Sequence, residues 1–193
     1  MSKPKIGIII CTTREGRFGD KPAQWIFELA KAHGGADFEA VDLRDFPLPL
    51  FNELKSPAWE SPKNEVAQRW GRKVAELDGY VFVTGEYNHG VPGVLKNALD
   101  HTYKGFNRKP AAFVGYGGVG AARAVEHLRL ILVELQVAPL RNAVHIGMAE
   151  FMGLLQQGKT FADYPYLAQS GAQMLGDLIW WTTTLKAGRH ASA

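Results

Sequence analysis

Lys5-Ile6-Gly7-Ile8-Ile9-Ile10 is the stretch that decides the fold, and Cys11-Thr12-Thr13-Arg14-Glu15-Gly16-Arg17-Phe18-Gly19-Asp20-Lys21 follows it as a polar loop. A nearly uninterrupted run of β-branched apolar residues is typical of a parallel strand buried on both faces. Pro22 can open a helix, which apolar residues continue at helical spacing until Gly34 ends it. Strand, loop and helix therefore form the first unit of the chain.

The same alternation continues to the end of the chain. Apolar runs predict strands at 38–43, 80–84, 111–115 and 143–146, and amphipathic spacing predicts helices at 66–77, 91–103, 121–136 and 166–185. Prolines interrupt 46–51, which we expect to be an ordered loop. Strands that alternate with helices predict a doubly wound, parallel α/β sheet with right-handed crossovers.

Length and composition favour one globular domain. We expect residues 1–193 to form a single unit, with about 188–193 as a frayed tail. The only cysteine, Cys11, excludes an internal disulfide and fits a reducing compartment. The amino terminus has too few apolar residues for a signal peptide or a membrane span, so we expect a cytoplasmic protein that binds no membrane.

The charge pattern bears on the class of ligand. The net charge is +3, and no run of five or six basic residues occurs. A nucleic-acid-binding protein would be expected to show a clustered basic stripe with interleaved aromatic residues, so we expect no nucleic-acid partner. A modest, dispersed positive charge suits a small anionic ligand.

The first loop combines features that suit a phosphate. In a doubly wound sheet, ligands bind beyond the carboxyl ends of the strands. Thr12 and Thr13 supply hydroxyls, Arg14 and Arg17 supply planar cationic donors, and the loop leads to the positive end of a helix. It is not a nucleotide-triphosphate loop, because Pro22 rather than Ser or Thr follows Lys21. The alternative interpretation is a solvated turn that the threonines cap.

Two further loops should lie at the same edge of the sheet. Gly85-Glu86-Tyr87-Asn88-His89-Gly90 places aromatic side chains and free amides where one edge of a planar ring could lie, although a lone histidine is often only a surface residue. Gly115-Tyr116-Gly117-Gly118-Val119-Gly120 matches the dinucleotide fingerprint only superficially, because two strand–helix units precede it. Its glycines leave room for a flat ligand, or else form a plain tight turn.

Together, these motifs resemble the NADPH-dependent FMN reductases, a flavodoxin-like family of quinone, azo-dye and chromate reductases. The resemblance runs from Lys5 to about Trp181, and residues 86–100, EYNHGVPGVLKNALD, carry it most specifically. It implies a three-layer α/β/α fold with a five-stranded parallel sheet of order 2-1-3-4-5. It also implies a homodimer, or a dimer of dimers, with each flavin near the subunit interface.

The resemblance assigns the cofactor-binding residues by position. Those implied to surround the FMN phosphate are Thr12, Arg14, Arg17, Phe18 and Gly19, together with Thr13 beside them. Those implied to follow the isoalloxazine ring are Glu86, Tyr87, Asn88 and His89 on one edge and Tyr116, Gly117 and Gly118 on the other. The chain departs from the family at Gly85, where proline is usual, and at His89, where a small residue is common.

The implied activity is electron transfer from NADPH or NADH through bound FMN to a small acceptor such as a quinone, an azo compound, free flavin or a metal oxyanion. Because the flavin carries this chemistry, we expect neither a catalytic side chain nor a metal site. One alternative is an electron-carrying flavodoxin that does not oxidise a nicotinamide. The other is a dehydrogenase that holds NAD directly at residues 115–120.

Overall fold

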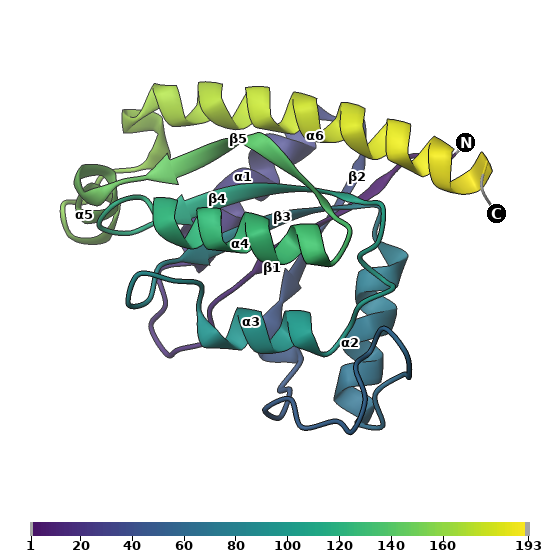
Figure 1. The fold of residues 1–193 in the computed structure, drawn as a ribbon. Helices are drawn as coiled ribbons and strands as arrows, with labels where there is room; N and C mark the ends of the chain where they lie inside the picture. Colours follow the sequence, from purple (N-terminus) through teal and green to yellow (C-terminus); the bar gives the residue numbers. More distant parts are fainter. Residues whose placement is uncertain (1, 192–193) are drawn as a thin grey trace.

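A computed structural model describes residues 2–191, and its centre is one five-stranded parallel sheet (Figure 1). The strand order is β2-β1-β3-β4-β5, which confirms the predicted order. The strands are β1 (Lys5–Ile10), β2 (Asp37–Asp42), β3 (Gly79–Gly85), β4 (Pro110–Tyr116) and β5 (Ala138–Ile146).

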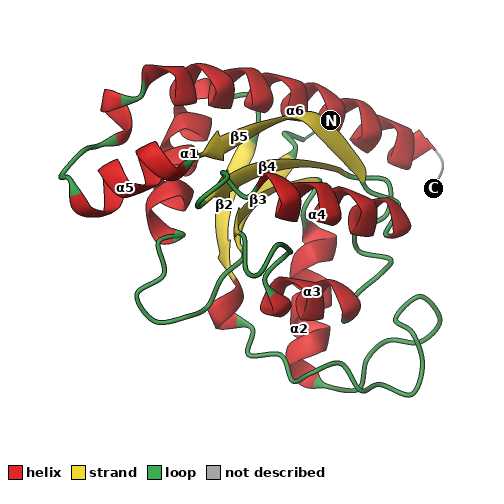
Figure 2. Cartoon of the chain, turned by 60° about the vertical axis from the view of Figure 1, so that its left-hand side comes forward, coloured by secondary structure: helices red, strands yellow, loops and turns green. Residues whose placement is uncertain are grey.

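Helices cover both faces of the sheet (Figure 2). Three of them lie on one face: α1 (Asp20–His33), α5 (Met148–Gln156) and α6 (Pro165–Ala191). Three lie on the other: α2 (Glu65–Glu76), α3 (Gly93–Asp100) and α4 (Ala122–Glu134). Short 3-10 turns occupy η1 (Leu43–Asp45) and η2 (Phe161–Asp163).

The apolar run of β1 fills both layers of the core. Ile8 packs with α1 and α6 in one cluster, whereas Ile9 packs with α2 and α3 in the other, and both are fully buried. Successive side chains of a strand point to opposite faces, so a strand that is covered on both sides must be apolar at every position. The continuous pattern, rather than an alternating one, therefore decided this layered architecture.

Several boundaries and short elements differ from the sequence-based predictions. The last strand, β5, begins at Ala138 rather than 143, and α3 spans Gly93–Asp100 rather than 91–103. The pattern did not reveal α5, η1 or η2. The expected frayed tail also differs, because residues 188–191 continue α6, where Arg189 binds Asp78 at 2.7 Å and the Arg108 carbonyl at 2.8 Å. The rest of that predicted tail, residues 192–193, lies outside the described residues.

The long α6 remains a surface helix. It lies along one face of the sheet and ends near the amino terminus (Figure 1), where the Lys186 ammonium donates to the Lys3 carbonyl at 3.2 Å. Trp180 and Trp181 are 61% and 39% exposed, so neither belongs to the core. None of the helices within residues 2–191 has the length and apolar character needed to cross a membrane.

Candidate functional site

The carboxyl ends of β1, β3 and β4 bring the three predicted loops together. Parallel pairing aligns Ile10 of β1 with Val83 of β3, and Gly85 of β3 with Tyr116 of β4. A depression of about 130 Å³ opens between the loops. It is lined by Arg14, Arg17, Phe18, Gly85, Glu86, Tyr87, Tyr116, Gly117 and Phe151. The first of the expected features, convergence of three loops at one rim, is thus present.

The first loop presents backbone donors that the protein does not use. No hydrogen bond within the described chain is donated by the amides of Gly16, Phe18 or Gly19. Gly16 has a φ of +63°, a conformation that L side chains rarely adopt. Since α1 begins at Asp20, these amides lie at the positive end of its dipole. Free amides at a helix start are suited to an anion.

Arg17 is placed in this loop but is fully occupied by the protein. A guanidinium has five N–H donors, and all five bind within the structure: to the Thr12 carbonyl, to Asp20 and to both oxygens of Asp42. The hydrogen bond with Asp42 is the main cause that raises the pKa of Arg17. A direct contact between this side chain and a phosphate would require one of these bonds to break.

The other loop cation is free. The Arg14 side chain is exposed and takes part in no hydrogen bond or ion pair among residues 2–191, while its carbonyl accepts from Arg44 at 2.6 Å. Arg44 also donates to the carbonyl of Thr13, which is half-buried, at 3.2 Å. Arg44 thus fixes the backbone from outside and leaves the Arg14 guanidinium available for a ligand.

Two predicted phosphate residues form the floor beneath the loop. The Thr12 hydroxyl lies 3.0 Å from the Tyr116 hydroxyl, and a Cβ added at Gly19 would lie 2.7 Å from the latter. Phe18 packs its ring 5.3 Å from that of Tyr116 and 4.6 Å from that of Phe151. Phe18 is therefore a buried support for the floor, and only glycine fits at position 19 without moving a hydroxyl.

The second loop folds as a tight hairpin turn. Tyr87 and Gly90 exchange two backbone hydrogen bonds of 3.1 Å, and the residues between them, Asn88 and His89, have φ values of 48° and 74°. Positive φ at both central positions is the requirement of a type I′ turn, which asparagine tolerates well. The amides of Asn88 and His89 donate no hydrogen bond within the described residues. The His89 ring lies 6.0 Å from that of His127 on α4.

The carboxylate of Glu86 is occupied by hydrogen bonds within the protein. It accepts from the amides of Arg123 and Ala124, each at 3.2 Å, and from the Arg123 guanidinium, so it caps the start of α4. Burial alone would raise the pKa of Glu86, but the Arg123 side chain and the two amides lower it below its ordinary value. The Glu86 side chain holds the second loop against the third.

The glycine loop combines one close approach with one open surface. A Cβ at Gly115 would lie 2.3 Å from the Gly120 carbonyl, so β4 and the start of α4 pack backbone against backbone. In contrast, a Cβ at Gly117 would meet nothing within 4 Å, and one at Gly118 only a methionine methyl at 3.6 Å. Gly117 and Gly118 therefore leave a flat, exposed backbone surface beside the depression.

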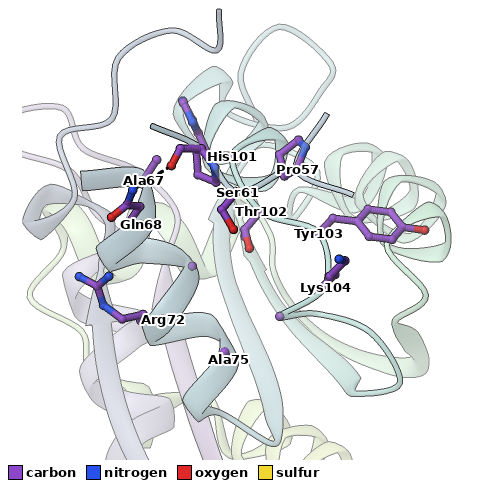
Figure 3. Close-up of a pocket in the computed structure, with 13 residues that line it drawn as sticks. Pro57, Ser61, Ala67, Gln68, Arg72, Ala75, His101, Thr102, Tyr103 and Lys104 are labelled. Carbon is purple, nitrogen blue, oxygen red and sulfur yellow. Dashed lines mark hydrogen bonds between the residues drawn. The ribbon is translucent and has the colours of Figure 1, made fainter. Parts of the chain in front are cut away.

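A larger cavity of about 400 Å³ lies elsewhere, between α2 and the turn that follows α3 (Figure 3). Its lining includes Gly71 and Gly105. Arg72 projects from α2 away from Thr102 (Figure 3). None of the three loops contributes to it. A third hollow, of about 540 Å³ beside Trp25 and Phe161, is larger still. The strand ends and the free amides, rather than size, select the smaller depression.

The donor set fits a flavin mononucleotide. The first loop offers amides and a free guanidinium for a phosphate, and the other two offer unused amides beside a flat backbone surface for a planar ring. The sequence alone did not identify Asp42, Arg44, Arg123 or Phe151, which orient these loops. For Asp42 a signal existed, since it ends the strand next to β1 at the same edge.

Comparisons with known proteins agree with this fit. The family model of the NADPH-dependent FMN reductases matches residues 4–151. An NAD(P)H-dependent FMN reductase of Schizosaccharomyces pombe is 39% identical over 145 residues, which cover 73% of this chain and 72% of that protein. A 2-hydroxy-1,4-benzoquinone reductase of a Burkholderia species is 34% identical over 140 residues, covering 69% of this chain and 72% of that one.

A solved structure extends the likeness to the fold. FerB of Paracoccus denitrificans, a flavoenzyme NAD(P)H:(acceptor) oxidoreductase, has a TM-score of 0.72 at 20% identity, and the match covers 94% of this chain and 98% of FerB. At that identity the likeness concerns the fold alone. Strand order, loop chemistry and the match over residues 4–151 lead to one conclusion: the chain belongs to the NADPH-dependent FMN reductase family of oxidoreductases.

Proposed function

We propose that the depression at the carboxyl ends of β1, β3 and β4 holds FMN and that the protein passes electrons from NADPH or NADH through it to a small acceptor. The observation that carries this proposal is the group of unused amides at Gly16, Phe18 and Gly19, next to the free Arg14 guanidinium. Several N–H donors at a helix start together with a cation favour a phosphate. Thr12 and Thr13 add hydroxyls, and Arg17 keeps the loop in place.

The ring of the flavin would lie between the second and third loops. Unused amides of Asn88, His89 and Gly118 can donate to its oxygen and nitrogen atoms, and Gly117 leaves space for its face. Tyr87, which is 39% exposed, lies at the mouth of the depression and can cover one side of the ring. Glu86 contributes through its hold on α4.

The chemistry divides between cofactor and protein. Bound FMN supplies hydride acceptance and electron donation. The protein binds the phosphate, orients the ring and directs backbone N–H groups at atoms that gain negative charge on reduction, which stabilises that charge without a proton donor. The fixed φ values of Asn88 and His89 hold those donors in place before the ligand arrives.

The acceptor belongs, in our proposal, to the class of small aromatic oxidants, with a quinone as the representative. Relatives named 2-hydroxy-1,4-benzoquinone reductase and quinone reductase support this choice. The exposed aromatic ring of Tyr87 and the exposed apolar Val119 at the two flavin loops can contact a flat apolar acceptor. Azo compounds, free flavin and metal oxyanions are the alternative acceptors. We propose NADPH rather than NADH as the preferred nicotinamide because the family is NADPH-dependent.

We further propose a cytoplasmic homodimer, or a dimer of dimers, with the flavin near the subunit interface. Leu54 and Trp59, 92% and 83% exposed, lie on the segment that Asn97 fixes through 2.8 and 2.9 Å hydrogen bonds to Pro49 and Phe51. Asn97 belongs to α3, which directly follows the second flavin loop. Exposed apolar side chains on a fixed segment beside a site are suited to an interface.

The catalytic proposal is tested with purified protein that is saturated with FMN and freed of excess. We expect stoichiometric flavin, and loss of its visible absorbance on anaerobic mixing with NADPH or NADH, followed by recovery on addition of a quinone. Flavin that stays oxidised with both nicotinamides would identify an electron carrier instead, and protein that takes up no FMN would overturn the proposal. As a matched pair, Arg14→Ala should weaken FMN binding by about 1.5–3 kcal/mol, whereas Arg141→Ala, another exposed arginine, should not.

The assembly is tested by sedimentation velocity. We expect a species of at least twice the 21.3 kDa chain mass. Replacing Leu54 by Asp should shift the population towards single chains, because a charge would have to be desolvated in the interface. The Leu54 side chain is almost fully exposed in the single chain, so the variant should fold normally. A wild-type protein of single-chain mass, or an unchanged mass for L54D, would refute this interface.

A further inference from the structure

Two buried hydroxyl groups beneath the first loop carry two O–H hydrogens but share only one hydrogen bond. Thr12 Oγ1 and the Tyr116 hydroxyl lie 3.0 Å apart, Thr12 is fully buried, and Tyr116 is 6% exposed. Neither hydroxyl makes a second hydrogen bond within residues 2–191. Each carries one O–H hydrogen, but a single bond joins them. One O–H hydrogen therefore remains without an acceptor, which is costly in a buried place.

The surroundings of this pair contain several donors that the protein does not use. A Cβ built on Gly19 would lie 2.7 Å from the Tyr116 hydroxyl and 3.0 Å from Thr12 Oγ1, so both oxygens lie directly at the start of α1. The amides of Gly16, Phe18 and Gly19 in the same loop donate no hydrogen bond within the described chain. The neighbouring carboxylates of Asp20 and Asp42 are both bound to Arg17. An anion bound at the start of α1 would accept the remaining O–H hydrogen of the pair.

We propose that Tyr116 is a positioning residue for the FMN phosphate: its phenol donates to Thr12 Oγ1 and thereby turns the Thr12 O–H towards a phosphate oxygen. This inference rests on the proposed function and deepens it. A phenol is a stronger acid than an aliphatic alcohol, and a hydroxyl that accepts a bond becomes a better donor itself. For this reason we assign the Tyr116 phenol as the donor to Thr12 Oγ1 and the Thr12 hydroxyl as the donor to the phosphate.

The packing around Tyr116 fixes its hydroxyl for this role. The ring lies against Gly85, where a Cβ would come within 3.1 Å of it, and against the ring of Phe18 at 5.3 Å. Burial raises the pKa of Tyr116 to about 12, so the phenol stays protonated at neutral pH. The Tyr116 side chain thus reaches the phosphate end of the site, whereas its backbone belongs to the loop expected at the isoalloxazine ring.

The test compares FMN with riboflavin, which has the same ring and no phosphate. Flavin fluorescence titrations are carried out on wild type, Tyr116→Phe, Thr12→Val and the double variant. We expect Y116F to weaken FMN binding about tenfold, because the Thr12 O–H is then no longer oriented towards the charged phosphate. Riboflavin affinity should stay unchanged. T12V should weaken FMN binding at least as much as Y116F does. The double variant should bind FMN no more weakly than T12V alone, because Tyr116 acts through Thr12.

Tyr80→Phe serves as the matched control. Its hydroxyl bonds the Val74 and Gly105 carbonyls, each at 3.1 Å, and lies in the layer of α2 on the other face of the sheet. The inference is overturned if Y116F weakens FMN and riboflavin equally, since that marks a loss of structure. It is also overturned if the losses of Y116F and T12V add, since Tyr116 would then act independently. A wild type that binds both flavins equally would instead refute the phosphate site itself.

Discussion

Replacing Arg17 by methionine is expected to lower the free energy of unfolding by about 3 kcal/mol and to abolish high-affinity FMN binding. The Arg17 side chain is 2% exposed, whereas the carboxylates it joins, Asp20 and Asp42, are 54% and 25% exposed. Removal of the guanidinium leaves Asp42 partly buried without its cation and frees the Thr12 carbonyl. Chemical denaturation and FMN titration measure the two effects.

The pH dependence identifies the pair responsible. Burial would raise the pKa of Asp42, but hydrogen bonds from Arg17 and the Arg44 amide hold it below its ordinary 3.8. Stability from such a depressed carboxylate is fully present above the unfolded-state pKa and is lost as the pH falls through the folded-state value. The gap in unfolding free energy between wild type and R17M should therefore narrow below pH 3.8.

Two further arginine variants make the result specific. Arg17→Lys keeps the charge, but a single ammonium cannot make the five bonds of the planar fork, so it should restore only part of the stability. Arg141→Met removes an exposed arginine and should change neither the free energy of unfolding nor the FMN affinity. If R17M bound FMN as tightly as R141M, Arg17 would not support the loop.

The fold was predictable because its decisive signals are local. The run around Ile8 and Ile9 reports burial on both faces, and Gly34 reports the end of α1, without knowledge of any distant residue. β5 was recognised only in part because it is an edge strand whose first half contains Pro139 and exposed Arg141. The place of β5 in the sheet depends on its pairing with β4, which no local sequence pattern indicates.

The meeting of the three loops was predictable from the sequence, but their side-chain contacts were not. Parallel strands put their carboxyl ends at one edge, so three unusual loops had to meet. The role of each charged side chain there depends on partners far along the chain, because Arg17 donates to Asp42 and Arg123 donates to Glu86. A loop arginine predicts a phosphate contact equally well whether or not a carboxylate reaches it first. The free guanidinium is that of Arg14.

Replacing Gly115 by alanine is expected to destabilise the protein and disorder the third loop, residues 115–120. The added Cβ would lie 2.3 Å from the Gly120 carbonyl oxygen and 3.1 Å from the Ala121 Cβ. The Gly120 carbonyl cannot simply retreat, because His145 Nδ1 contacts it at 2.8 Å and Gly120 has a φ of 61°. The cost should be about 3 kcal/mol, the upper end for overpacking, since backbone rather than a flexible side chain must move.

A matched glycine separates this clash from the general cost of adding a methyl group. Gly93 is the first residue of α3 and follows the second loop, residues 85–90, and a Cβ at Gly93 would meet nothing within 4 Å. By thermal unfolding, G115A should lose about 6–12 °C in Tm, whereas G93A should not fall below wild type. FMN titration should show weaker binding for G115A alone. Because Gly117 and Gly118 lie within three residues of the clash, a G115A protein with normal Tm and normal FMN affinity would mean that β4 and α4 do not meet backbone to backbone.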